Sequence, residues 1–159
     1  MIRVGLGQDQ HALADGRRLV LGGVDVEHPR GLHGHSDADV LTHAVIDALL
    51  GAAALGTIGE HFPDSDERYR GVSSLTLLAA TAAMLRDRGW QVGNVDSVIV
   101  AQQPRLAAHL RTMASRLAQV LDIDEGRVSV KATSPEGIGA LGREEAISAS
   151  AVALLEQRT

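Results

Sequence analysis

The chain of 159 residues carries a formal net charge of −5 and no cysteine, and 45% of its residues are hydrophobic but only 2% aromatic. The lack of cysteine excludes a disulfide framework, and an acidic balance with so few aromatic rings argues against a nucleic-acid partner. No apolar run is long enough to span a membrane and no signal-peptide pattern opens the chain, so we expect one soluble cytoplasmic domain over residues 1–159.

The first part of the chain favours strands. Residues 2–9 alternate between apolar and other side chains, which predicts a β-strand. Residues 18–27 show a similar pattern, interrupted by Gly22 and Gly23, and paired glycines of this kind are typical of a tight turn. The sequence therefore predicts a strand followed by a small N-terminal hairpin.

A helix is expected next. Over residues 37–50 the apolar side chains recur three and four positions apart, which is the period of a helix with a buried face. Ser36 or Asp37 is suited to cap its N-terminus, and Gly51 is suited to end it.

Residues 51–72 break this periodicity because they are rich in Gly, Pro and Asp. A loop of this length in a small domain is often functional, although a plain solvated connection explains the composition equally well. Helical spacing returns at residues 73–88 and 105–121, the second of which follows Pro104, a residue that suits a first helical position.

Further strands complete the predicted fold. Residues 94–101 and 127–132 are short apolar runs on either side of the third predicted helix. Residues 145–155 alternate loosely, which favours a strand and leaves a helix as a competitor. The order of elements predicts an α+β fold with a mixed four-stranded sheet, helices packed on one of its faces, and the small N-terminal hairpin.

A carboxylate and two imidazoles form a candidate metal site. Asp9 and His11 stand two residues apart at the end of the first predicted strand, so their side chains project from the same face. His43 lies on the predicted helix and can complete the set. This is the ligand set of a catalytic zinc site that keeps one coordination position open. A lone histidine is more often an ordinary surface or hydrogen-bonded residue, and only the combination favours a metal.

Two acidic residues share the predicted helical face of His43. Asp39 lies four residues before it and Asp47 four residues after it, a spacing that places side chains on one face of a helix. Either carboxylate could orient an imidazole from behind the metal ligands.

A second polar cluster follows the strand predicted at residues 127–132. Lys131 leaves the core face of that strand, and Thr133, Ser134 and Glu136 come next, followed by a glycine-rich turn. Two hydroxyls and a carboxylate could hold phosphate oxygens and a hard divalent cation such as Mg²⁺ or Mn²⁺. An ordinary Ser-Pro-Glu-Gly turn is the simpler interpretation. Arg143 supplies either a further anion contact or only a surface charge.

Several segments, taken in their order and spacing, resemble the 2-C-methyl-D-erythritol 2,4-cyclodiphosphate synthase family over nearly the whole chain. They are Gly7-x-Asp9-x-His11, His35-Ser36-Asp37-x-Asp39 with His43, Asp47-Ala48-Leu49-Leu50-Gly51-Ala52, Phe62-Pro63-Asp64-Ser65-Asp66, Gly93-Asn94-Val95-Asp96, Ala101-Gln102-x-Pro104 and Val130-Lys131-Ala132-Thr133. The resemblance implies a homotrimer with active sites between neighbouring subunits, in the non-mevalonate route to isoprenoid precursors. The family cyclises a cytidine-diphosphate-linked methylerythritol 2-phosphate and releases CMP.

The resemblance also implies roles for individual residues. Zinc would be held by Asp9, His11 and His43, and a second divalent ion, Mg²⁺ or Mn²⁺, by Glu136, while His35 and Ser134 would stabilise the transition state. The methylerythritol portion would lie against Phe62, Pro63, Asp64, Ser65 and Asp66. The cytidine and diphosphate would be surrounded from the adjoining subunit by Ala101, Gln102, Gln103, Pro104, Arg105, Leu106 and Ala107, with Lys131, Thr133 and Ser134. Further substrate contacts are expected at Ser36, Thr57, Ile58, Gly59, Ala140 and Arg143.

Thr57, Ala140, Leu141 and Glu144 depart from the usual pattern of the family, and all of them lie outside the expected metal ligands. Two rival interpretations remain. A zinc-dependent phosphohydrolase would use the same open metal position to activate water and would give a linear product. A non-catalytic trimer with structural zinc would need a closed site of four ligands, for which the sequence offers no cysteine and no evident fourth ligand.

Overall fold

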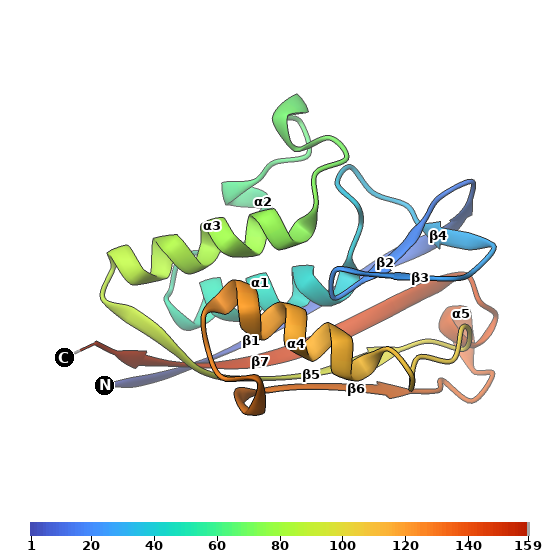
Figure 1. Ribbon diagram of the computed structural model, residues 1–159. Helices are drawn as coiled ribbons and strands as arrows, with labels where there is room; N and C mark the ends of the chain where they lie inside the picture. The colour runs from blue at the N-terminus through green and yellow to red at the C-terminus, as the bar shows by residue number, and fades with distance from the viewer. Residues whose placement is uncertain (159) are drawn as a thin grey trace.

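The computed structural model describes residues 1–158 and consists of two layers, a twisted sheet and a set of helices on one of its faces (Figure 1). Within these residues the sheet has five strands in the order β4-β1-β7-β5-β6. The strands are β1 (Ile2–Asp15), β2 (Leu19–Leu21), β3 (Val24–Val26), β4 (Arg30–Leu32), β5 (Trp90–Val100), β6 (Val128–Thr133) and β7 (Ala146–Gln157). The helices are α1 (Val40–Ala52), α2 (Ile58–His61), α3 (Ser74–Asp87), α4 (Leu110–Leu121) and α5 (Gly139–Gly142), with 3-10 turns η1 (Glu67–Tyr69) and η2 (Glu125–Arg127).

The sheet is mixed, because β5 and β6 run parallel while β1 and β5 each pair antiparallel with β7. The predicted α+β architecture with helices on one face is confirmed, and the predicted count of four strands is wrong by one. The extra strand is β4, which pairs antiparallel with Leu13, Ala14 and Asp15 at the far end of β1. A strand of three residues is too short to show a period of two in the sequence, and so β4 left no signal.

The N-terminal hairpin is confirmed as the separate two-stranded sheet β2–β3. Gly22 and Gly23 form its turn with φ angles of 56° and 71°, a left-handed pair that glycine adopts without strain. Both turn amides donate hydrogen bonds to the Asp39 carboxylate, at 2.8 and 2.7 Å. The hairpin turn is thereby fastened to the N-terminus of α1.

The helix α1 begins at Val40 rather than at residue 37, because Ala38 has a left-handed φ of 57°. The expectation that Ser36 or Asp37 caps this helix is therefore wrong. Asp39 is the N-cap, and its carboxylate accepts the Thr42 amide at 3.0 Å.

The helix α1 lies directly on β1 because both elements present small residues at the contact. A Cβ atom placed on Gly5 would lie 2.0 Å from the Ala48 carbonyl oxygen, and one placed on Gly7 would lie 2.0 Å from that of Ala44. Only a glycine at each position lets the two backbones approach so closely. The contact sets the height of α1 above the strand, and His43 precedes Ala44 on that helix.

The helix predicted at residues 73–88 is confirmed as α3, and the tail is the strand β7 rather than a helix. The third predicted helix starts late, since α4 begins at Leu110 and Pro104 lies in the preceding loop after a cis peptide bond. The interpretation of Pro104 as a first helical residue is wrong, because the fixed φ of proline suits a turn as well as a helix. The helix α1 continues through Gly51 to Ala52, so the expectation that Gly51 ends it is wrong, and residues 53–72 contain only the single turns α2 and η1 as regular elements.

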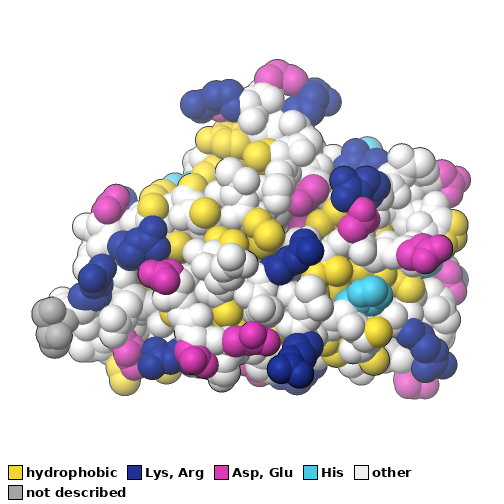
Figure 2. Space-filling view, in the orientation of Figure 1, with side chains coloured by type: hydrophobic (Ala, Val, Ile, Leu, Met, Phe, Trp, Pro, Cys, Tyr) yellow, Lys and Arg dark blue, Asp and Glu magenta, His cyan; other side chains and the backbone are white. Residues whose placement is uncertain are grey.

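No described element covers the face of the sheet opposite the helices (Figure 1). Apolar side chains are exposed on that face. Ile2, Val4 and Leu6 on β1 are 65%, 64% and 65% exposed, and Val152 on β7, which pairs with Leu6, is 43% exposed. A contiguous apolar strip of this kind is typical of a protein–protein interface. No helix within residues 1–158 has the length and the hydropathy needed to cross a bilayer. On the face of the molecule that Figure 2 shows, basic and acidic side chains are interspersed.

Candidate metal centre and substrate clefts

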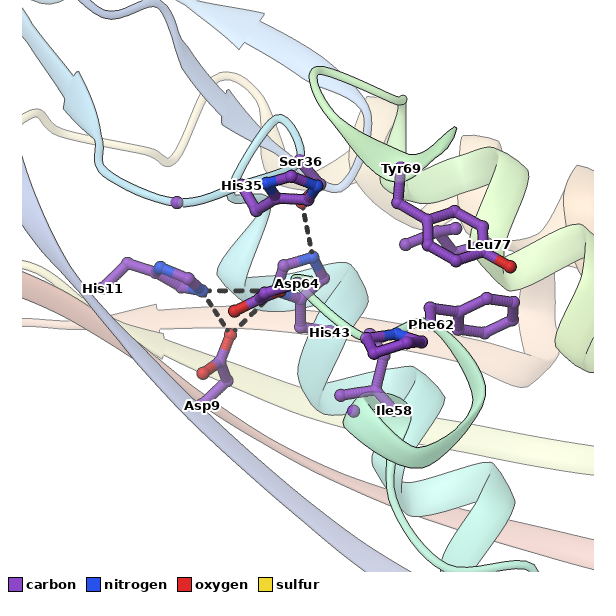
Figure 3. A pocket seen from close by; sticks show the side chains of 13 residues that line it. Asp9, His11, His35, Ser36, His43, Ile58, Phe62, Asp64, Tyr69 and Leu77 are labelled. Carbon is purple, nitrogen blue, oxygen red and sulfur yellow. Dashed lines mark hydrogen bonds and ion pairs between the residues drawn. The ribbon is translucent and has the colours of Figure 1, made fainter. Parts of the chain in front are cut away.

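Asp9, His11 and His43 meet at the junction of β1 and α1 (Figure 3). Asp9 and His11 project from the helix-facing side of β1, as their spacing predicts, and His43 comes from the first turn of α1. The Asp9 Oδ2 atom lies 2.9 Å from His11 Nε2 and 3.0 Å from His43 Nδ1, and the two nitrogens are 3.3 Å apart. The edge of a tetrahedron with zinc–ligand bonds near 2.1 Å is about 3.4 Å, so the three atoms are spaced as zinc ligands would be.

In each imidazole, the ring nitrogen that points away from the centre of the triad makes a hydrogen bond to another group. The nitrogen that points to the centre, His11 Nε2 or His43 Nδ1, is thereby left for a cation. His11 Nδ1 lies 2.7 Å from the His33 carbonyl oxygen, which can only accept, so Nδ1 carries a hydrogen and Nε2 is the nitrogen whose lone pair a metal would use. His43 Nε2 lies 2.8 Å from Ser74 Oγ and 3.2 Å from Ser36 Oγ. Two imidazoles and a carboxylate arranged in this way are a donor set suited to zinc.

The electrostatics of the triad favour a positive charge at its centre. Burial opposes ionisation of Asp9, but the hydrogen bonds from His11 and His43 outweigh it and hold the pKa of the carboxyl well below its usual range. Burial likewise disfavours the charged form of His11, but the hydrogen bond to Asp9 raises the pKa of this imidazole above its usual value, and the nearby Asp64 acts in the same direction. A cation in the triad would take the place of the hydrogens in these hydrogen bonds to Asp9.

Asp39 and Asp47 share the face of α1 with His43, but they accept hydrogen bonds from backbone amides and from the Thr42 hydroxyl and not from the imidazoles. Besides the amides of the hairpin turn, Asp39 accepts the Thr42 hydroxyl at 2.7 Å, and burial raises the pKa of this carboxyl. Asp47 accepts the Ile58 amide at 2.7 Å and so fixes the start of α2, while partial burial raises its pKa. Both carboxylates position the chain around the site.

The triad forms one wall of a cleft of about 320 Å³ (Figure 3). The opposite wall is apolar, and the Phe62 and Tyr69 rings in it pack edge to face with centroids 5.5 Å apart. Of the expected substrate and catalytic residues, His35, Ser36, Ile58, Gly59, Phe62, Pro63 and Asp64 line this cleft. Thr57, Ser65 and Asp66 lie next to it in the chain and do not line it, although the Asp66 carbonyl oxygen accepts a hydrogen bond from His35 Nε2 at 3.0 Å.

Most of the other expected binding residues line a second cleft, of about 290 Å³, between the end of β6 and the loop before α4. It is lined by Ala101, Gln102, Gln103, Pro104, Arg105, Leu106, Ala107, Leu110, Ala132, Thr133 and Ser134. The two clefts share no lining residue. The residue sets expected for methylerythritol and for cytidine are thus in separate places on one chain.

Glu136 lies at the edge of the second cleft and does not belong to the triad. Its amide donates to Ser134 Oγ at 3.0 Å, and the next amide, that of Gly137, donates to Gln102 Oε1 at 2.9 Å. The loop that carries Glu136 is thereby tied to the wall of the cleft.

Three more expected substrate residues do not line either of these clefts. The Lys131 ammonium lies 2.6 Å from both carboxylate oxygens of Asp96 and holds the pKa of that carboxyl below its usual value. Arg143 pairs with Glu145 at 2.7 Å, and Ala140 lies in the short helix α5.

The sequence did not reveal several residues of the site. Ser74, Asp37 and the His33 carbonyl stand behind the imidazoles, and Tyr69 and Leu77 line the first cleft. The one available signal for Ser74 was its place at the start of a predicted helix, where a serine ordinarily suggests capping.

Comparisons with known proteins agree over nearly the whole chain. The sequence model of the YgbB family matches residues 2–156. A relative from Syntrophomonas wolfei named 2-C-methyl-D-erythritol 2,4-cyclodiphosphate synthase is 60% identical over 98% of this chain and 99% of its own. One of the same name from Synechococcus elongatus is 55% identical over 96% of each chain.

Solved structures show the same fold. The bifunctional IspDF from Campylobacter jejuni matches with a TM-score of 0.95 and 39% identity, over 99% of this chain and 42% of that one. The CDP complex of IspF from Plasmodium falciparum matches with a TM-score of 0.86 and 30% identity, over 99% of this chain and 97% of that one. The chain therefore belongs to the YgbB family, the family of the 2-C-methyl-D-erythritol 2,4-cyclodiphosphate synthases.

Proposed function

We propose that this chain converts 4-diphosphocytidyl-2-C-methyl-D-erythritol 2-phosphate into 2-C-methyl-D-erythritol 2,4-cyclodiphosphate and CMP, a step of non-mevalonate isoprenoid precursor synthesis. The observation that carries the proposal is the triad of Asp9, His11 and His43 on the wall of a cleft that presents further polar side chains. Relatives of high identity that carry the synthase name support it.

Two metal ions belong to the proposal. Zinc would be held by Asp9, His11 and His43, whose donor atoms and spacing fit it. Glu136 would hold a second divalent ion, Mg²⁺ or Mn²⁺, on the diphosphate, since a carboxylate oxygen suits such hard cations. When bound, these ions would supply positive charge that offsets the repulsion between the phosphate groups.

The two clefts would take different parts of the substrate. The first cleft, with Phe62 and Asp64 on its walls, has the mixed lining that a branched polyol needs. The second cleft would hold the cytidine, and the relative solved with CDP supports a nucleotide site in this fold.

A homotrimer belongs to the proposal as well. The two clefts of one chain share no lining residue, and a second chain that brings its own cleft close would let one substrate fill both kinds of cleft. The exposed strip of Ile2, Val4, Leu6 and Val152 offers an apolar surface for such an assembly. Each active site would then combine the first cleft of one subunit with the second cleft of its neighbour.

The reaction needs alignment more than a protein base. An oxygen of the substrate's 2-phosphate attacks the β-phosphorus, a new P–O bond forms, and the P–O bond to CMP breaks as CMP departs with the electron pair. The nucleophile is already ionised near neutral pH, so no side chain has to remove a proton. The work left to the protein is to hold the groups in line and to donate hydrogen bonds to the developing charge, the role we assign to His35 and Ser134.

The test is ³¹P NMR of the purified protein with this substrate, Zn²⁺ and Mg²⁺, beside an EDTA-treated sample. A cyclic diphosphate that appears together with CMP, and only with metal, would support the proposal. A linear phosphate product with CMP would favour a zinc phosphohydrolase, and no reaction in a zinc-loaded trimer would favour a binding protein.

His43→Ala sharpens the test, because it removes one of the three ligands. We expect loss of bound zinc, measured by elemental analysis after gel filtration, and loss of most of the turnover. The matched control is His28→Ala, since the His28 ring lies away from the triad and bonds to the Arg30 carbonyl oxygen. A His43→Ala protein with full zinc content and normal turnover would remove the ligand assignment.

A further inference from the structure

The outer nitrogen of His43 faces two buried hydroxyl groups. Ser74 is fully buried and Ser36 is 9% exposed, and their Oγ atoms lie 2.8 and 3.2 Å from His43 Nε2. The Ser74 hydroxyl donates to Asp37 Oδ1, and the Ser74 amide donates to Asp37 Oδ2 at 3.0 Å. A continuous series of contacts therefore runs from the metal triad through Ser74 to Asp37.

The direction of these hydrogen bonds follows from the groups that make them. An ionised carboxylate can only accept, so the Ser74 hydroxyl hydrogen points to Asp37. The oxygen of Ser74 is then an acceptor on its other side, where it meets His43 Nε2, and that nitrogen must carry a hydrogen. His43 Nδ1 is therefore the nitrogen whose lone pair a cation would use, and it lies 3.0 Å from Asp9 Oδ2.

We infer that Asp37 and Ser74 are positioning residues that keep a hydrogen on His43 Nε2 and so present Nδ1 to a metal, which sets the affinity of the triad for that metal. The inference rests on the metal site proposed above. Neither side chain reaches the ligand atoms, since both lie behind the imidazole. Groups that orient a ligating histidine in this way commonly change metal affinity by about 10- to 100-fold when they are removed.

The pair also explains how three segments converge on one imidazole. Asp37 belongs to the loop before α1, Ser74 is the first residue of α3, and His43 lies on α1. The Asp37 carboxylate additionally accepts the Asp39 amide at 3.1 Å, which fixes the loop in front of the helix. A change at Ser74 is therefore a cleaner test than a change at Asp37, because it removes a hydroxyl and keeps the backbone contact.

The experiment compares Ser74→Ala with Ser73→Ala, which removes an adjacent exposed hydroxyl that makes no cap hydrogen bond. Two quantities are measured: the ¹⁵N chemical shifts of the His43 ring in EDTA-treated protein, and zinc affinity by competition with a chromophoric chelator. We expect the shift of a protonated Nε2 in the wild type and in Ser73→Ala, whereas Nδ1 shares its hydrogen with Asp9 when no metal is bound. Ser74→Ala should show a mixture of tautomers and zinc binding at least about tenfold weaker.

Asp37→Asn provides a second variant if Ser74→Ala fails to fold. The introduced amide group must direct its NH₂ either at the Ser74 hydroxyl or at the Ser74 amide, so it breaks one of two existing bonds or reverses the hydroxyl. We expect a changed tautomer signature and weaker zinc binding here as well. Ser74→Ala or Asp37→Asn protein with wild-type shifts and wild-type affinity would overturn the inference. Wild-type protein that binds no zinc would contradict the proposed metal site instead, and the shifts of its metal-free His43 would still be measured.

Discussion

Asp9 contacts both imidazoles of the triad, and this single carboxylate controls the charge of the site. The pKa of Asp9 is lowered, so its stabilising effect is present above the usual carboxyl pKa and lost as the pH falls. The pKa of His11 is raised, so its effect is present below the usual imidazole pKa and lost as the pH rises through the raised value.

Metal-free protein should therefore be most stable between about pH 4 and pH 6.5. The measurement is the free energy of unfolding from denaturant titrations in EDTA across pH 2 to 9. Asp9→Asn keeps the shape of the side chain and removes its charge, and it should flatten the profile. An unchanged profile in that variant would show that other groups set the pH dependence.

Glu136 offers a carboxylate with no ion pair or side-chain hydrogen bond among the described residues. Glu136→Gln should raise the Mg²⁺ or Mn²⁺ concentration needed for half-maximal activity by about tenfold or more, because a neutral amide holds these ions weakly. The subunit assembly, followed by light scattering, should stay the same. Glu125→Gln, at an exposed site in η2, is the control. A superimposable metal-response curve would count against the role.

Residue spacing predicted some contacts and missed others for identifiable reasons. Asp9 and His11 could be placed on one face because a strand fixes that relation over two residues. Asp39 and Asp47 were expected to orient an imidazole because they share a helical face with His43, but nearer amide donors hold both carboxylates. The contact of Ser74 with His43 joins positions 31 apart in the sequence, and no local pattern encodes such a contact.

At Gly7, the backbones of β1 and α1 are too close together to leave space for a side chain between them. Gly7→Ala would place a methyl group against the backbone of α1, and we expect the free energy of unfolding to fall by about 1–3 kcal/mol, as for other overpacked sites. Zinc should also bind more weakly, because the helix that carries His43 would move away from Asp9. Denaturant unfolding and chelator competition measure the two effects.

The control for Gly7→Ala is a glycine of α1, the helix that packs on β1. The nearest atom to a Cβ placed on Gly51 is the Leu6 carbonyl oxygen at 3.9 Å, so alanine fits there. Gly51→Ala should leave zinc binding unchanged and stabilise the protein by about 0.5–1 kcal/mol, the usual gain from alanine over glycine in a helix. Equal losses in both variants would mean that the close contact is not what matters.

Among the helices and strands, the sequence predicted the long elements and missed the short ones. Periodicity was enough for α1, α3, β5, β6 and β7, in which alternate or helically spaced residues face one core. It was not enough for β4, whose three residues are too few to show a period, or for the start of α4. The loop around Pro104 has the composition of a helix start, and it lines the second cleft instead.

For the whole molecule, the separation of the two clefts leads to a test by mixing. His43→Ala damages the first cleft, and Ser134→Ala damages the second. If active sites form between subunits, each variant alone should be nearly inactive, and co-expressed chains should regain activity. A mixed trimer would contain one site that combines two undamaged clefts.

The recovered activity should appear only in mixed assemblies, which two different affinity tags can isolate. Mixing the separately folded variants without subunit exchange is the control and should stay inactive. Mixed trimers as inactive as their parents would indicate that each chain completes its own site.

The triad also acts on the chain as a cross-link. It joins Asp9 to His43, 34 positions apart, and the loop that it closes contains the hairpin β2–β3 and the strand β4. A bound cation would restrict the unfolded chain much as a disulfide across the same span does, an effect of about 4 kcal/mol from loop-closure entropy. Chelation should therefore loosen the hairpin β2–β3 before the five-stranded sheet, and the amides of the hairpin should be the first to exchange with deuterium.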